Sequence, residues 1–196
     1  MLTQFPAGVP GIDVYHADVV DSFHALAAAG IKFVFIKATQ GLAEIDPAHA
    51  EYLQRAIEAE IIPSSYEFFT VGDPLVQARH FVNNAGELAG QLPLTLDVET
   101  YFPGVPEDAL ACCAEIKRLT LHFPIVYCSL SFWRQYLEPI FPKETTLWLA
   151  EYGVDAPSIA CSFWQWTSGF AVDGVAGVCD CDVYMGTLEE LLGLRM

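Results

Sequence analysis

Short runs of apolar, β-branched and aromatic residues recur along the chain and predict eight strands. The strands are expected near residues 11–16, 32–38, 62–69, 93–99, 124–129, 146–152, 162–167 and 178–184. The segments that follow the first five strands have helical periodicity, at 19–29, 47–60, 74–89, 107–122 and 130–138. Asp46-Pro47 and Asp73-Pro74 are typical helix starts, and Gly30 is a typical helix stop.

The two gaps between the last three strands, 153–161 and 168–177, lack room for a crossover helix, because such a connection usually takes about a dozen residues or more. We therefore predict an α/β fold, an incomplete TIM-like barrel in which five βα units are followed by three strands with little helix. A doubly wound open sheet is the structural alternative. With 196 residues, 53% of them hydrophobic, and no linker-like stretch, we expect a single domain over 1–196.

The charge of the chain limits its partners. It carries 25 acidic and 9 basic residues, a formal net charge of -16. This balance argues against nucleic acid, whose phosphates need Lys and Arg, and gives no attraction to an anionic membrane. No apolar run is long enough to span a bilayer. A secretory signal requires Lys or Arg near the N-terminus, and neither occurs before Lys32. We expect a monomer synthesised in the cytoplasm without a signal peptide, unless a leader has been removed.

The cysteines are not spaced as a disulfide framework or as a zinc site. Cys112 and Cys113 are neighbours in a helical stretch and cannot readily pair with each other. We expect reduced, buried thiols, and neither a metal nor another cofactor. The six cysteines are Cys112, Cys113, Cys128, Cys161, Cys179 and Cys181.

Acidic residues stand inside or at the end of several apolar strands. Asp97 and Glu99 end the fourth strand, Asp13 lies in the first, and the eighth contains Asp180 and Asp182. A carboxylate in such a strand costs several kcal/mol unless it is paired, hydrated or used. Residues two apart on a strand share a face, and in a closed barrel the first strand neighbours the eighth. We therefore expect the acids to converge at the carboxyl ends of the strands.

The Asp97-Val98-Glu99 segment indicates glycoside hydrolysis, in which one carboxyl group must stay protonated near neutral pH to protonate the bridging oxygen. A neighbouring carboxylate and an apolar wall both raise the pKa of a carboxyl group. The plainer alternative is a pair of capping or salt-bridging acids. Asp13 could likewise be satisfied by backbone N–H groups or by His16, and Asp180 and Asp182 could bind a cation.

Aromatic residues cluster on the same strands, and their faces suit stacking on the apolar faces of sugar rings. Tyr66, Trp148 and Tyr152 stand where strand ends should face the barrel mouth. Ordinary core packing is expected of three others: Phe68, Phe69 and Trp164.

Taken in order, the motifs of the chain resemble those of the glycoside hydrolase family 25 lysozymes, which cleave peptidoglycan as N-acetylmuramidases. Residues 11–16 resemble the family's G-[IV]-D-V-S-H, residues 33–41 its F-V-[FY]-I-K-A-T-E-G, and residues 94–99 its L-x-L-D-V-E. The other matches are 65–69 to A-Y-H-F, 147–152 to L-W-[IL]-A-x-Y, 164–167 to W-Q-[WY]-T and 179–184 to V-D-x-[ND]-x-F. Each motif is weak alone, but all of them in order are a strong signal.

The resemblance implies a catalytic domain with a barrel of five βα units and a muramidase site that needs no metal. Glu99 would be the general acid, while Asp97 would modulate it and, with Tyr66, orient the N-acetyl group whose oxygen acts as the nucleophile. Asp13 and Asp180 would stabilise positive charge in an oxocarbenium-like transition state. The residues implied to contact the substrate are Tyr66, Trp148, Tyr152, Lys37, Tyr127 and Asp182.

The chain departs from the family pattern at several positions. Ala17-Asp18-Val19 replaces the usual Gln-Gly, Gln40 stands for Glu, and Glu67 stands for His. The departures keep open the alternative of a catalytically weak glycan-binding protein. The acids, with or without His16, keep open a metal-dependent barrel hydrolase. The leading expectation is a muramidase that acts on bacterial peptidoglycan, as a phage lysis protein or an exported effector.

Overall fold

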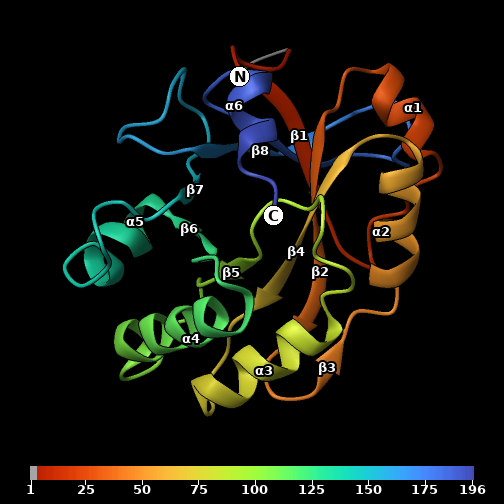
Figure 1. Cartoon of the computed structure of the whole chain (residues 1–196). Helices are drawn as coiled ribbons and strands as arrows, with labels where there is room; N and C mark the ends of the chain where they lie inside the picture. Colours follow the sequence, from red (N-terminus) through yellow and green to blue (C-terminus); the bar gives the residue numbers. More distant parts are fainter. Residues whose placement is uncertain (1–3) are drawn as a thin grey trace.

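Eight strands close into a barrel in the computed structural model, which describes residues 4–196 (Figure 1). Strand β1 pairs with both β2 and β9, so the first and last strands form the seam of the barrel. Strand β3 (Glu44–Ile45) lies outside the ring beside β2. The predicted barrel is confirmed, and the alternative of an open sheet is wrong. The strands of the ring are β1 (Val9–Val14), β2 (Phe33–Gln40), β4 (Ile62–Phe68), β5 (Thr95–Asp97), β6 (Ile125–Ser129), β7 (Leu147–Ala150), β8 (Phe163–Phe170) and β9 (Cys179–Tyr184).

The direction of the last strand differs from that of the others. Within the ring, neighbouring strands from β1 through β8 are parallel, whereas β9 is antiparallel to both β8 and β1. Strand β9 therefore begins at the rim where the parallel strands end. Asp180, near its start, is the register partner of Asp13, and Asp182 is the partner of Gly11. The expectation that every acid stands at the carboxyl end of its strand is wrong for β9.

Helices cover the outside of the barrel, and the two longest, α3 and α4, pack side by side at the lower edge of Figure 1. The five predicted helices are present, although the first is shorter than expected and α5 continues into a π-helical turn, η1. A short sixth helix, α6, was not predicted. The helices are α1 (Phe23–Ala28), α2 (His49–Glu58), α3 (Pro74–Asn84), α4 (Val105–Thr120), α5 (Leu130–Phe132), η1 (Trp133–Leu137) and α6 (Leu188–Gly193).

One of the two predicted helix starts is confirmed. The Asp73 carboxylate accepts two N–H groups of the first turn of α3, as an N-cap should. Helix α2 begins only at His49, and Asp46 accepts a hydrogen bond from the N–H of Ala48 ahead of the helix. The other Asp46 oxygen contacts His16, so this carboxylate braces a loop instead of capping the helix.

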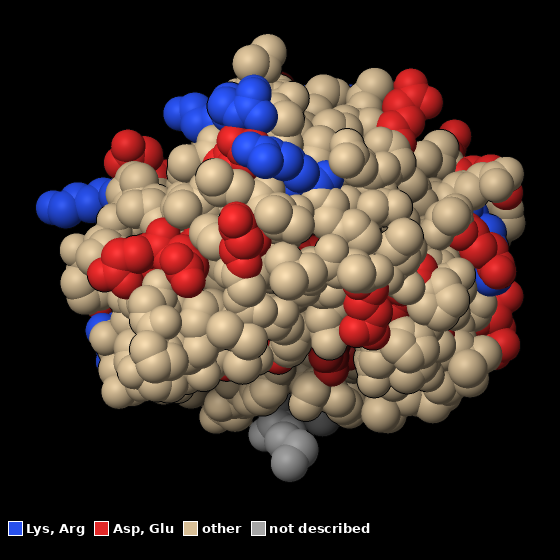
Figure 2. Space-filling view, turned by 90° about the horizontal axis from the view of Figure 1, so that it is seen from below, with Lys and Arg blue, Asp and Glu red and all other residues tan. Residues whose placement is uncertain are grey.

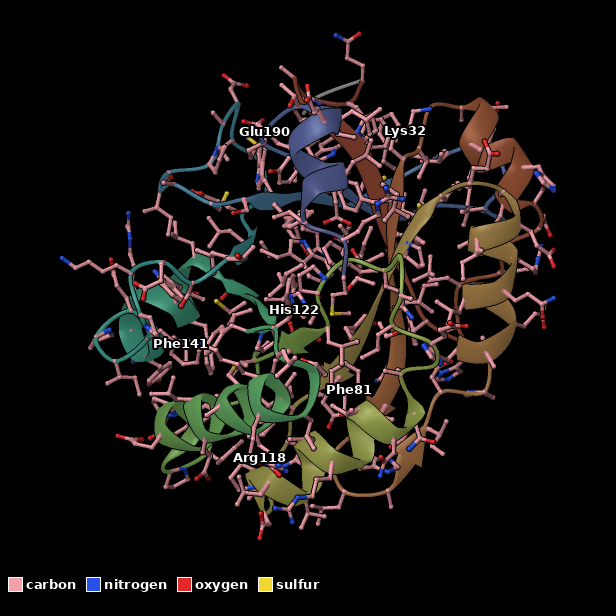
Figure 3. All side chains as sticks on the ribbon, in the orientation of Figure 1. Lys32, Phe81, Arg118, His122, Phe141 and Glu190 are labelled. Carbon is pink, nitrogen blue, oxygen red and sulfur yellow. The ribbon has the colours of Figure 1, made fainter. Side chains whose placement is uncertain are left out.

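The interior of the barrel is packed largely with aromatic side chains. Phe35 and Trp148 stack with their ring centroids 3.9 Å apart. Gly11 is needed beside them, because a Cβ atom there would lie 2.3 Å from the ring of Phe33. Outside the ring, Phe81 of α3 is fully buried in a second cluster between helices and strands (Figure 3). The inner aromatic layer forms the floor below the barrel mouth.

The surface reflects the acidic composition of the chain. Acidic side chains are scattered over the face in Figure 2, whereas basic ones gather mainly near one edge. All six cysteines are free thiols and five are buried, as expected. Among residues 4–196, no helix is long and apolar enough to cross a membrane.

Candidate active site

A pocket with a volume of about 380 Å³ opens at the rim where the parallel strands end. Every predicted site residue except Asp182 lines this pocket, so the closed barrel brings together residues from the whole length of the chain. The lining also contains three residues that the sequence did not single out for the site, namely Tyr15, Phe68 and Gln165. The full lining is Asp13, Tyr15, Lys37, Tyr66, Phe68, Asp97, Glu99, Tyr127, Trp148, Tyr152, Gln165 and Asp180.

Asp13 and Asp180 face each other across the seam between β1 and β9. Burial, and then the charges of Asp182 and Asp180, raise the pKa of Asp13 well above its usual range. Burial is also the main reason that the pKa of Asp180 rises to about 6. Neighbouring carboxylates resist joint ionisation, so this part of the pocket holds a proton at mildly acidic pH.

Asp97 and Glu99 form the second acidic pair. Asp97 is buried at the end of β5, and its Oδ1 atom has no hydrogen-bond partner among residues 4–196. Burial, and then the charge of Glu99, raise the pKa of Asp97 well above its usual range, while Lys37 opposes the rise. Glu99 stands at the exposed rim, where partial loss of water raises its pKa and Lys37 again opposes the rise. Glu99 therefore combines access to a ligand with a raised pKa.

Gln165 connects one acid to two tyrosines. Its Nε2 atom donates a hydrogen bond to Asp13 Oδ2 at 2.7 Å. Its Oε1 atom accepts hydrogen bonds from the hydroxyl groups of Tyr127, at 2.9 Å, and Tyr152. The amide thus fixes the orientation of a carboxylate and two aromatic side chains. Its place in strand β8, two residues after the inward-facing Phe163, was the signal that could have revealed it.

Asp182 lies below the pocket instead of lining it. The residue is fully buried, and its Oδ1 atom accepts a hydrogen bond from Trp148 Nε1 at 2.7 Å. Burial raises the pKa of Asp182 well above its usual range, while the bond from Trp148 lowers it. Asp182 therefore supports the indole from beneath, which corrects the expectation that it contacts the substrate.

Lys37 is the one basic residue among the described residues that line the pocket. Its Nζ atom donates a hydrogen bond to Gln40 Oε1 at 2.6 Å and lies 4.7 Å from the centroid of the Phe68 ring. Phe68 is half-buried at the pocket wall, so the expectation that it only packs in the core is wrong. Its alternation with Tyr66 on β4 puts both rings on the same face.

Two other polar residues have partners outside the pocket. His16 Nδ1 contacts Asp46 Oδ2 at 2.7 Å, so the alternative in which His16 pairs with Asp13 is wrong. Glu67 is fully buried outside the pocket lining, where it accepts a hydrogen bond from the hydroxyl of Thr39. Burial raises the pKa of Glu67 to about 8. Among residues 4–196, no group of three or more His, Cys, Asp or Glu side chains could hold a metal ion.

Carboxyl groups of raised pKa at the open end of an α/β barrel, flanked by aromatic side chains, are typical of glycoside hydrolases. Comparison with known proteins narrows this class. The family model described as Glycosyl hydrolases family 25 matches residues 12–175, and the chain belongs to that family.

Individual relatives agree with this assignment. The chain is 28% identical over 182 residues to the autolytic lysozyme of Clostridium acetobutylicum, a match that covers 89% of the chain. It is 28% identical over 210 residues to lysozyme M1 of Streptomyces globisporus, covering 96% of the chain and 71% of that protein. The crystal structure of the bacterial lysozyme from Streptomyces coelicolor has a TM-score of 0.90 and 27% identity, covering 96% of this chain and 97% of that one. The chain spans only 55% of the length of the Clostridium protein.

Proposed function

We propose that this protein is an N-acetylmuramidase, which hydrolyses the β-1,4 bond between N-acetylmuramic acid and N-acetylglucosamine in bacterial peptidoglycan. The observation that carries the proposal is the pair formed by Asp97 and Glu99, in which a buried carboxyl group lies below an accessible one and both have a raised pKa. Membership of glycosyl hydrolase family 25 and similarity to lysozymes support the same activity.

Glu99 is the general acid in this proposal. It donates its proton to the bridging oxygen as the bond between that oxygen and the anomeric carbon breaks. Its raised pKa keeps more of the carboxyl protonated at a given pH, and its exposed position gives access to the bridging oxygen. Afterwards the Glu99 carboxylate accepts a proton from the water that completes the hydrolysis.

Asp97 and Tyr66 position the nucleophile, which is the oxygen of the substrate's own acetamido group. Asp97 lines the pocket, and its carboxyl group is suited to accept the acetamido N–H, which turns the acetamido oxygen toward the anomeric carbon. Tyr66 lines the same pocket and limits the movement of the group. Water then opens the cyclic intermediate, so the enzyme itself supplies no nucleophile.

Asp13 and Asp180 stabilise the positive charge that develops on the sugar ring. With a pKa of about 6, Asp180 is mostly ionised at neutral pH, and Gln165 holds the Asp13 carboxylate in place. Four other residues that line the pocket and were predicted for the site are proposed to contact the sugar chain: Lys37, Tyr127, Trp148 and Tyr152.

We further propose that residues 1–196 act as a single catalytic domain and as a monomer, without a cofactor and without nucleic-acid or membrane partners. The net charge of -16 supports the exclusion of these two partners. Action on the bacterial cell wall is supported by similarity to an autolytic lysozyme.

Mass spectrometry of digested peptidoglycan tests the proposal. Purified peptidoglycan is incubated with the protein, and the new reducing ends are marked by reduction with borohydride. We expect the mark on N-acetylmuramic acid, no effect of a chelator, and loss of the product with Glu99→Gln. The exposed glutamate Glu58, on α2 and remote from the pocket, supplies the control variant Glu58→Gln.

Each other outcome contradicts the proposal in a different way. Reducing ends on N-acetylglucosamine would assign the opposite bond, and a loss of activity with chelator would indicate a metal-dependent hydrolase. Binding of the glycan without new reducing ends would indicate a glycan-binding protein. Full activity of the Glu99→Gln variant would remove Glu99 from its role.

A further inference from the structure

Tyr15 is an exposed aromatic residue at the rim of the pocket, and nothing in the mechanism above uses it. It follows β1, lines the pocket beside Asp13 and Lys37, and leaves 40% of its surface exposed. The motif that residues 11–16 resemble has serine at this position. The exposed ring is not part of the packed core of the barrel.

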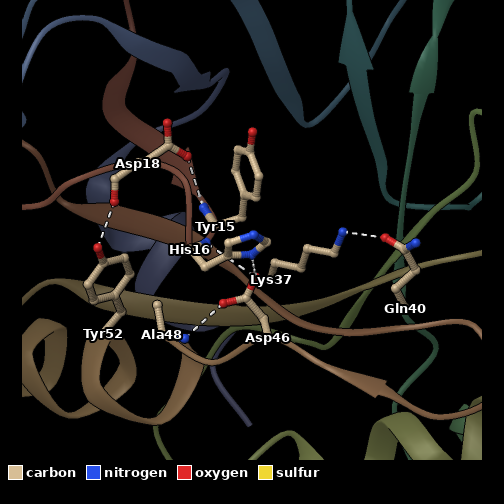
Figure 4. A network of polar contacts seen from close by, with 8 residues as sticks. All are labelled: Tyr15, His16, Asp18, Lys37, Gln40, Asp46, Ala48 and Tyr52. Atoms are coloured by element: carbon tan, nitrogen blue, oxygen red, sulfur yellow. Dashed lines mark hydrogen bonds and ion pairs between the residues drawn. The ribbon is translucent and has the colours of Figure 1, made fainter.

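The backbone around Tyr15 is held by hydrogen bonds from three parts of the chain (Figure 4). The Tyr15 N–H donates to Asp18 Oδ2 at 3.0 Å, and the Asp18 N–H donates back to the Tyr15 carbonyl at 3.0 Å. The hydroxyl of Tyr52 on α2 donates to the Asp18 carbonyl at 2.6 Å. His16 is fixed to Asp46 through its backbone N–H and its ring. The loop therefore presents Tyr15 on a rigid backbone.

These bonds do not involve the Tyr15 side chain, whose ring projects away from them in Figure 4. The imidazole of His16 contacts the ring edge to face, with centroids 5.1 Å apart and planes at 80°. Lys37 Nζ lies 6.0 Å from the ring centroid. A ring supported in this way loses little conformational entropy when a ligand covers its open face.

We propose that Tyr15 is a substrate-binding residue that stacks on the apolar face of a pyranose ring of the bound sugar chain. The ligand is a β-1,4-linked amino sugar chain, so the inference rests on the proposed function and names a further contact at the same site. Tyr152, which follows β7, is the second exposed tyrosine of the pocket. Strands β9 and β8 lie between β1 and β7, so the two rings border the rim on either side of Asp180 and Gln165.

Binding and kinetics of two Tyr15 variants test the inference. Tyr15→Ser removes the ring, and Tyr15→Phe keeps it while removing the hydroxyl. Neither change touches the hydrogen bonds of the loop, because those bonds use backbone atoms of this residue. Dissociation constants are measured by calorimetry in the Glu99→Gln background, with a tetrasaccharide of alternating N-acetylglucosamine and N-acetylmuramic acid. The values of kcat and KM are measured with the same tetrasaccharide and an active enzyme.

With Tyr15→Ser we expect the dissociation constant and KM to rise about fivefold while kcat changes little, because a stacking contact serves binding alone. Tyr15→Phe should stay within about twofold of the parent. Unchanged binding by Tyr15→Ser would overturn the inference, as would an equal loss in both variants, since that loss would come from the hydroxyl. A parent protein that binds the tetrasaccharide through Tyr15 but cleaves no peptidoglycan would contradict only the proposed function.

Discussion

Replacing Glu67 with glutamine is expected to remove a large pH-dependent loss of stability. Glu67 is fully buried, its Oε2 atom accepts the hydroxyl of Thr39, and its Oε1 atom has no partner among residues 4–196. Burial raises its pKa from an ordinary 4.5 to about 8, although the bond from Thr39 and the charge of Lys37 oppose the rise. The folded protein therefore keeps this proton over a range in which the unfolded chain releases it.

The sign and size of the effect follow from that difference. Between pH 4.5 and about pH 8 the folded state binds one proton more than the unfolded state, so the free energy of unfolding falls as the pH rises. Below this range both states are protonated and the loss is absent. Each pKa unit corresponds to about 1.4 kcal/mol, so the full loss is about 5 kcal/mol at most. Glu67→Gln cannot ionise and can still accept the Thr39 hydroxyl, so it should lack this loss.

Urea unfolding between about pH 5 and about pH 8.5 measures the difference. At the acidic end we expect the parent and Glu67→Gln to agree within about 1 kcal/mol, and at the alkaline end the variant should be more stable by several kcal/mol. Glu58→Gln controls for the loss of one negative charge. Other buried acids affect both proteins equally, so only the difference between the two curves matters. Parallel curves over the whole range would refute a Glu67 proton held by burial.

Further predictions concern the site and its floor. Glu99→Gln should lower kcat by about 100-fold or more, and retention of most of the kcat in single-turnover assays would contradict its role. The value of kcat should rise with pH as Asp180 ionises near pH 6 and fall at higher pH as Glu99 loses its proton. A kcat that is constant through pH 6 would exclude a role for the ionised Asp180 carboxylate. Gly11→Ala should cost about 1–3 kcal/mol in urea unfolding through overpacking, and an unchanged midpoint would contradict the close contact seen at Gly11. Trp148→Phe should cost a similar amount, about 1–3 kcal/mol, because Asp182 loses its donor; Asp182→Asn should then recover part of it.

Sequence patterns predicted the barrel, and together with the family resemblance they predicted most of the residues that line the candidate pocket. Apolar runs predicted the strands. The two gaps without room for a crossover helix predicted that the βα units give way to strands with little helix after β7. Two elements were not predicted: β3, whose two residues are too short for a periodic pattern, and the six-residue helix α6 after the last strand. The direction of β9 was not readable either, because an alternating strand has the same pattern in both directions.

The error over Asp182 has a physical origin, which is depth along a strand. Asp180 and Asp182 have the same spacing in the sequence as Asp97 and Glu99, but register places Asp180 beside Asp13 at the rim and Asp182 beside Gly11 one layer lower. Only the pairing of strands reveals which member of such a pair is accessible. Gln165 was missed for a different reason. A neutral amide in an apolar strand is also costly to bury, but only charged and aromatic residues of the strands were predicted for the site.

The seam between β1 and β9 has a consequence for how catalytic competence arises. Asp13 and Asp180 stand on opposite sides of that seam, 167 positions apart in the chain. A partly folded chain in which β1 and β9 have not yet paired lacks the juxtaposition of Asp13 and Asp180, even if its other strands are in place. Hydrolytic activity should therefore appear during refolding only once β1 and β9 have paired, together with protection of the amides between these strands from exchange with solvent.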